Sequence, residues 1–62
     1  MINIKKFRKR KKMSQKELAK NLSVNQTVVS QWEREIVNPR ADKLPEIAKI
    51  LGCTIDDLFK DE

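Results

Sequence analysis

The stretch from Ser14 to Arg34 constrains the fold most strongly, because it has the pattern of two short amphipathic helices separated by a break. The first helix is predicted over about residues 15–22. It begins with a Ser-x-x-Glu capping box, in which Ser14 and Glu17 satisfy exposed backbone N–H groups reciprocally. The apolar positions of this helix fall on one stripe at helical spacing: Leu18, Ala19 and Leu22.

The second helix is predicted over residues 26–34, after Asn25, which is a good N-cap residue. Val29 and Trp32 share one face of this helix, with Val28 at its edge. The opposite face carries amides, hydroxyls and a guanidinium group: Gln26, Thr27, Ser30, Gln31 and Arg34. A short helix with an apolar back and such a front is suited to reading base edges in a DNA major groove.

Length and composition limit the remaining possibilities. Sixty-two residues predict a single domain, residues 1–62, which buries only about 60% of its unfolded surface. No apolar run approaches the roughly 18 residues needed to span a bilayer, and no apolar segment follows the basic N-terminus to make a secretory signal. Cys53 is the one cysteine and the sequence has no histidine, so neither a disulfide within the chain nor a zinc site is expected. These features favour a reduced, cytoplasmic protein.

Charge is distributed unevenly along the sequence. Residues 1–40 contain 11 Lys/Arg and 3 Asp/Glu, whereas residues 41–62 contain 3 Lys/Arg and 6 Asp/Glu. The first part, at +8, suggests a polyanionic partner that the second part, at −3, does not share. Alternatively, the basic run from Lys5 to Lys12 is simply a solvated helix face.

Three further helices are predicted outside this central pair. Asn3 is expected to cap a first helix, and Asp42 is expected to cap a fourth helix that has Pro45 in its first turn and ends at Gly52. Thr54 begins a short fifth helix with acidic residues at its start. The inward-facing residues of the first of these helices are Ile4, Phe7 and Met13. Leu44, Ile47, Ala48 and Leu51 form the apolar stripe of the fourth helix, and Ile55, Leu58 and Phe59 are the apolar residues of the fifth.

The loop after the second helix of the pair contains two unusual apolar residues, Ile36 and Val37. One of them tucks under the edge of the domain, or both belong to a subunit contact or lie along a deoxyribose edge. Trp32 is expected in the core. A protein that binds single strands would instead need exposed aromatic rings on which bases stack.

The sequence resembles the phage repressor and Cro type of helix-turn-helix domain, the Xre family, from about Ile4 to Phe59. The segments that carry the resemblance are Met13–Ala19, Val29–Glu33, Asn38-Pro39 and Ile47–Gly52. The resemblance implies an all-α fold, a compact five-helix bundle in which residues 26–34 form the recognition helix. It also implies that Gln15 meets a phosphate at a helix N-terminus, and that Arg8 forms a partly buried ion pair with Glu33.

Two positions depart from the family pattern. Ser23 occupies the turn position where the family usually has glycine, and Lys12 replaces a frequent glycine after the first helix. If these positions need a positive φ, a residue with a side chain costs on the order of 1 kcal/mol at each.

The residues expected to contact bases are Gln26, Thr27 and Gln31, because glutamine pairs with adenine and the threonine methyl contacts thymine. Phosphate contacts are expected from Gln15, Asn25, Ser30, Arg34, Asn38 and Arg40. Alternatively, Arg40 reaches a minor-groove edge. If this helix face is merely solvated, none of these contacts exists.

The first functional hypothesis is a sequence-specific regulator of transcription, most simply a repressor, that binds double-stranded DNA. A homodimer would bind a palindromic operator, with Leu58 and Phe59 as candidate dimer contacts. The second hypothesis is a protein-interaction module, such as an antitoxin or an antirepressor-type partner. Peripheral membrane association through the first helix is a third, but only Ile4 and Phe7 could insert.

Enzymatic activity is not expected. The sequence has no histidine, no Gly-rich phosphate loop and no catalytic pair of acids, because Asp56 and Asp57 have the positions of helix-start residues. No catalytic residue, cofactor, metal or small-molecule effector is therefore predicted.

Overall fold

The helices of the protein are short, and local sequence signals set most of their ends. The computed structural model describes residues 2–60, and within them it contains α-helices and one 3₁₀ turn but no strand. The elements are α1 (Ile4–Arg10), α2 (Gln15–Leu22), α3 (Gln26–Glu33), the 3₁₀ turn η1 (Ala41–Lys43), α4 (Leu44–Leu51) and α5 (Ile55–Leu58). The prediction of an all-α fold with five helices is confirmed. Among the described helices, none has the length and apolar character needed to cross a bilayer.

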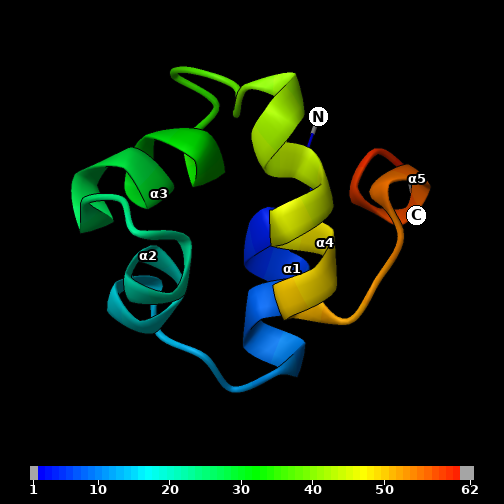
Figure 1. The fold of residues 1–62 in the computed structure, drawn as a ribbon, viewed down its shortest axis with the longest axis horizontal. Helices are drawn as coiled ribbons and strands as arrows, with labels where there is room; N and C mark the ends of the chain where they lie inside the picture. Colours follow the sequence, from blue (N-terminus) through cyan, green and yellow to red (C-terminus); the bar gives the residue numbers. More distant parts are fainter. Residues whose placement is uncertain (1, 61–62) are drawn as a thin grey trace.

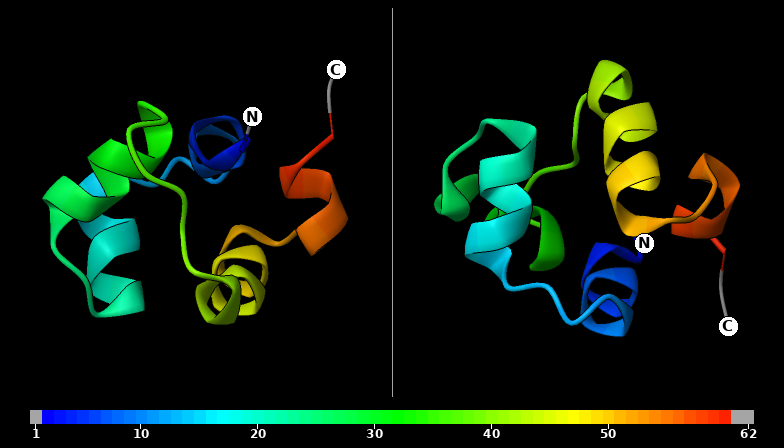
Figure 2. Two further views of the ribbon diagram at one scale, coloured as in Figure 1. Left: turned by 90° about the horizontal axis from the view of Figure 1, so that it is seen from above. Right: turned by 60° about the horizontal axis from the view of Figure 1, so that its bottom comes forward.

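Helices α1 and α4 lie in the middle of the molecule (Figure 1). The α2–α3 pair packs on one side of them and α5 on the other, as both views in Figure 2 show. The fully buried side chains come from every α-helix: Ile4, Leu18, Val29, Ile47 and Leu58. A radius of gyration of 10.2 Å is what a closely packed chain of this length should have.

Tertiary contacts override the predicted cap at Asn3. Its side chain caps no helix. Instead its amide donates to the carbonyl oxygens of Lys60 and Asp57, and its backbone N–H donates to Leu58 O at 2.7 Å. Asn3 therefore ties the start of α1 to the end of α5 and satisfies carbonyl groups that a helix end leaves unpaired.

The other cap predictions had mixed outcomes. Asp42 was wrong as the cap of α4, because it lies inside η1 and α4 begins two residues later, although Pro45 does occupy its first turn. Asn25 has the extended backbone of an N-cap but makes no side-chain bond to α3. Leu58 was wrong as a candidate dimer contact, since its side chain points from α5 into the core and is fully buried.

Within residues 2–60, a left-handed residue follows each of α1 to α4, one or two positions after the last helical residue. These residues are Lys12 (φ 56°), Ser23 (φ 58°), Glu35 (φ 60°) and Gly52 (φ 71°). After each of them, the next N–H donates to the carbonyl five residues earlier, as in Val24 N to Ala19 O at 2.9 Å. This backbone geometry is the Schellman motif. It occurs four times in this part of the chain, and in only one case is the left-handed residue a glycine, the residue that favours this conformation.

Replacing Ser23 by glycine should therefore raise the melting temperature. Relief of the left-handed strain should add about 1 kcal/mol to the free energy of unfolding, which corresponds to roughly 4–8 °C for a domain of this size. Thermal unfolding followed by circular dichroism measures the change. Ser30→Gly is the matched control, because Ser30 lies inside α3, where glycine lowers helix stability. If Ser23→Gly lowered the melting temperature as much as Ser30→Gly, the backbone at Ser23 would not be strained.

Candidate nucleic-acid interface

The turn between α2 and α3 is built from local signals and a shared apolar interior. The capping box forms at α2: Glu17 N–H donates to Ser14 Oγ at 3.0 Å, and Ser14 N–H donates to the Glu17 carboxylate at 3.1 Å. From α3, Val29 is fully buried and Trp32 is only 4% exposed, and both belong to the same core as the apolar stripe of α2. Burial of these two side chains fixes which face of α3 points outward.

The outward face of α3 is the polar front predicted from the sequence. Gln26 and Thr27 are exposed, and Ser30 and Gln31 are partly exposed. Within residues 2–60, the side chains of Gln26, Thr27 and Gln31 form no hydrogen bond with the rest of the protein, so their donors and acceptors remain available. Trp32 is buried, as predicted, so its ring is not available for base stacking.

A shallow polar depression connects the beginnings of α2 and α3. Gln15, Gln26, Thr27 and Ser30 line it. Gln15 lies at least 11 positions before the other three residues, and the fold brings all four onto one surface that has amide and hydroxyl groups and no charge.

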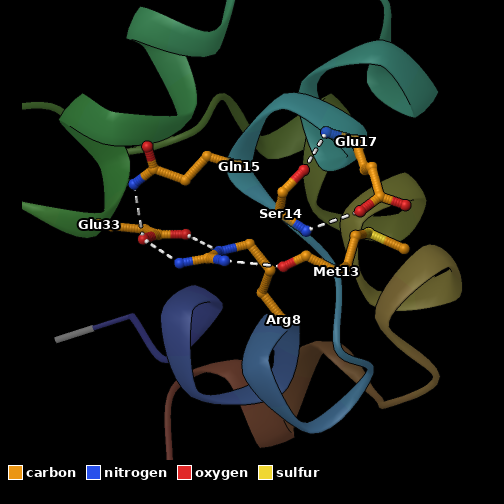
Figure 3. Close-up of polar contacts among 6 residues, drawn as sticks. All are labelled: Arg8, Met13, Ser14, Gln15, Glu17 and Glu33. Carbon is orange, nitrogen blue, oxygen red and sulfur yellow. Dashed lines mark hydrogen bonds and ion pairs between the residues drawn. The ribbon is translucent and has the colours of Figure 1, made fainter.

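Beside this surface, Glu33 at the end of α3 holds three helices together (Figure 3). Arg8 Nε donates to Glu33 Oε2 at 2.6 Å, and Arg8 Nη2 donates to Glu33 Oε1 at 3.1 Å. Arg8 Nη1 also donates to the carbonyl oxygen of Met13 at 2.7 Å. The expected ion pair is present, with side chains only 11% exposed for Arg8 and 3% for Glu33.

Gln15 is part of the same network, a role that its sequence position did not predict. Its side-chain Nε2 donates to Glu33 Oε1 at 3.0 Å (Figure 3). An amide nitrogen has two hydrogens, so the second remains available for another acceptor. Gln15 thus positions α3 relative to α2 in addition to lying in the polar depression.

The charge of Glu33 depends on these partners. Burial alone raises the pKa of Glu33, but hydrogen bonds from Arg8 and Gln15, with the positive charge of Arg8, lower it further than burial raises it. The pKa therefore lies below its ordinary value, and the carboxylate is ionised at neutral pH.

The remaining predicted phosphate contacts lie at different places. Asn25 is exposed immediately before α3 and Arg34 immediately after it, whereas Asn38 and Arg40 are exposed in the loop that follows. The lysines of α1 do not join the polar depression: Lys5, Lys6 and Lys9 line a separate hollow together with Glu33 and Glu35. The two carboxylates make this hollow a poorer site for phosphate than its lysines alone suggest.

Replacing Glu33 by glutamine should destabilise the protein at pH 7, because Arg8 keeps its buried charge and loses its counter-charge. The expected loss is about 2–4 kcal/mol. Since the pKa of Glu33 is lower in the folded than in the unfolded state, the stabilisation is present above the ordinary pKa of 4.5 and disappears as the pH falls through the lowered value. The stability of the Glu33→Gln variant should therefore fall less steeply with acid than that of the wild type.

Urea unfolding at pH 7 and at pH 3 measures both effects. Glu46→Gln is the control, because Glu46 forms an exposed pair with Lys43 at 3.6 Å and its loss should cost less than about 1 kcal/mol. Parallel acid dependence of the wild type and Glu33→Gln would show that the carboxylate is not the stabilising group.

Comparison with known proteins assigns the sequence to a family. A helix-turn-helix family profile matches residues 4–58. The chain is 38% identical over 53 residues to repressor protein C2 of Salmonella phage P22, covering 86% of this chain and 24% of that protein. It is 36% identical over 52 residues to the HTH-type transcriptional activator BcrR of Enterococcus faecalis, covering 84% of this chain and 26% of that protein. The chain thus spans about a quarter of the length of each relative. It belongs to the Xre-type helix-turn-helix family.

Proposed function

We propose that this protein is a sequence-specific regulator of transcription, most simply a repressor, that binds double-stranded DNA in the cytoplasm and reads the major groove with α3. The observation that carries the proposal is the division of α3 into a buried back and an unbonded polar front. Val29 and Trp32 are held in the core, while Gln26 and Thr27 are exposed at the helix start. A recognition helix that docks by its N-terminal part needs this arrangement.

Base contacts come from Gln26, Thr27 and Gln31. Each glutamine amide offers a donor and an acceptor together, which matches the N7 and N6 groups of adenine. The Thr27 methyl group is suited to the methyl group of thymine. Because these side chains have no partners within residues 2–60, binding DNA breaks no bond of the folded protein.

Phosphate contacts position this helix on the duplex. Gln15 lies at the N-terminus of α2, where backbone N–H groups and the helix dipole favour an anion. Its side-chain nitrogen has a second hydrogen, not used in the bond to Glu33, that can donate to a phosphate oxygen. Further phosphate contacts come from exposed or partly exposed side chains around α3: Asn25, Ser30, Arg34, Asn38 and Arg40. The net charge of +5 attracts the polyanion over a longer range.

One domain reads only a half-site, so we propose that two copies bind a palindromic operator as a homodimer. Repression is supported by the name of the phage P22 relative, and the enterococcal relative is named an activator. The competing hypothesis, a protein-interaction module of the antitoxin or antirepressor kind, requires no sequence preference on DNA.

Selection of bound duplexes from a random pool tests the proposal. We expect enrichment of a motif with two-fold symmetry and an affinity that falls steeply with salt, because phosphate contacts release counterions. A protein-interaction module would enrich no motif.

Two substitutions separate the roles of the residues. Gln26→Ala should cost about 1–3 kcal/mol of discrimination at one base pair, whereas Arg34→Ala should weaken all sequences alike and reduce the salt slope by about one. Lys49→Ala is the control for charge, since it removes a positive charge from the exposed surface of α4. Equal loss of preference from Gln26→Ala and Arg34→Ala would show that the roles are wrongly assigned.

A further inference from the structure

The proposed function leaves two surface features near the end of α3 unused. One is the apolar pair Ile36 and Val37, which are 55% and 45% exposed, so neither tucks under the edge of the domain. The other is a hollow of about 390 Å³, lined by residues of segments 2–9 and 33–35. Small-molecule sites in proteins begin at about 300 Å³, so the hollow is large enough for a ligand. The sequence did not predict it, because its two walls come from distant segments.

The apolar part of the hollow comes from Ile2 and from lysine stems. Ile2 is 8% exposed and belongs to the hydrophobic core. Lysine side chains lay their methylene groups along apolar surface and keep their ammonium groups in water. Three lysines of α1 line the hollow, Lys5, Lys6 and Lys9, so their stems extend the apolar surface that Ile2 begins.

The charged groups of the hollow have opposite signs on its two walls. Lys5 and Lys9 are four positions apart and therefore neighbours on one face of α1. Glu35 lies on the opposite wall, just after α3. All three side chains are exposed, and within residues 2–60 they form no hydrogen bond or ion pair. The fold thus brings opposite charges to one hollow without pairing them.

Glu33 also lines the hollow, but its carboxylate is already bound. Both of its oxygens accept hydrogen bonds, from Arg8 and Gln15, and its side chain is only 3% exposed. Glu35 is held by its backbone instead, which is left-handed with φ 60° and donates its N–H to Trp32 O at 3.2 Å. Glu35 is therefore the acceptor that the hollow offers to a ligand, at a fixed place relative to α3.

We propose that this hollow binds an α-amino acid with an apolar side chain. The carboxylate of the ligand pairs with Lys5 and Lys9, and its ammonium group pairs with Glu35. Its side chain covers Ile2 and the lysine stems. The inference does not depend on the proposed DNA binding.

Other classes of ligand fit the charges of the hollow less well. A phosphate or a simple carboxylate places negative charge beside Glu35, and a polyamine places positive charge beside the lysines. A neutral apolar molecule covers the charged groups without pairing them, which costs free energy. A zwitterion is the class that pairs with both walls at once.

The exposure of the charged groups limits the affinity. Ion pairs at exposed positions contribute little, so the dissociation constant should be on the order of 1 mM. Because the ligand joins α1 to the residue after α3, it binds the folded state alone. Binding should therefore raise the melting temperature as the ligand concentration rises.

Titration of the 62-residue protein with leucine tests the inference. Amide NMR signals of Lys9 and Glu35 should shift and saturate, and the melting temperature should rise. Isocaproate is leucine without its ammonium group, and isoamylamine is leucine without its carboxylate. Each should bind about threefold to fivefold more weakly than leucine, because each loses the ion pair with one wall.

Lys9→Gln and Glu35→Gln each remove the charge from one wall. Both should weaken leucine binding by about threefold to fivefold. Both should leave the melting temperature without leucine nearly unchanged, because these side chains are exposed and unpaired. Lys20→Gln and Glu46→Gln are the matched controls, since they remove the same charges from exposed positions outside the hollow. The controls should bind leucine as the wild type does.

The contrary outcomes are distinct. Absence of a saturable change with leucine would mean that the hollow is not an amino-acid site. Equal binding of isocaproate or isoamylamine would mean that only one wall is used, and unchanged binding by Lys9→Gln or Glu35→Gln would place leucine elsewhere. Each of these results overturns the inference. None of them involves DNA, so the proposed function is tested separately.

Discussion

The arrangement of the helix-turn-helix depends on one buried carboxylate, that of Glu33. It is the last residue of α3, and it accepts hydrogen bonds from Arg8 in α1 and Gln15 in α2. Arg8 also binds the carbonyl of Met13, in the segment that leads from α1 into α2. Three helices are therefore oriented by groups that are each costly to leave unpaired, because a buried charge without its partner is strongly destabilising. The apolar core alone would hold these helices together with less control of their mutual orientation.

A chain of this size has few apolar contacts to lose, so the helix ends contribute a large share of its order. Capping boxes form at the starts of α2 and α5, where Ser14 pairs with Glu17 and Thr54 with Asp57. Left-handed residues follow α1 to α4 within residues 2–60, and only the one after α4, Gly52, is a glycine. The protein thus accepts backbone strain in exchange for tight turns between short helices, and one of those turns sets the angle at which α3 leaves α2.

Features that depend on neighbouring residues were predictable from the sequence, and those that depend on distant residues were not. The bounds of α2 and the buried position of Trp32 follow from capping and helical spacing. Asn3 was misassigned because its amide bonds to carbonyl groups more than 50 residues away, which no local pattern reveals. Leu58 was misassigned because spacing identifies an apolar face without saying what covers it.

The candidate site shows the same limit. Exposure of Gln26 and Thr27 followed from the periodicity of α3, whereas the Arg8–Glu33 pair came from resemblance to a family. The bond between Gln15 and Glu33 was missed, because it requires the first residue of α2 to meet the last residue of α3. No signal in the sequence around Gln15 indicates that meeting.

The two faces of α3 have a consequence for how such a domain changes over time. Its anchoring residues, Val29, Trp32 and Glu33, are different positions from those that face outward, such as Gln26 and Thr27. Under the proposed function, the outward-facing residues of α3 can be substituted without disturbing the core. New side chains at these positions would change which operator the protein binds, while the fold stays the same. Divergence in what the domain recognises therefore need not pass through unstable intermediates.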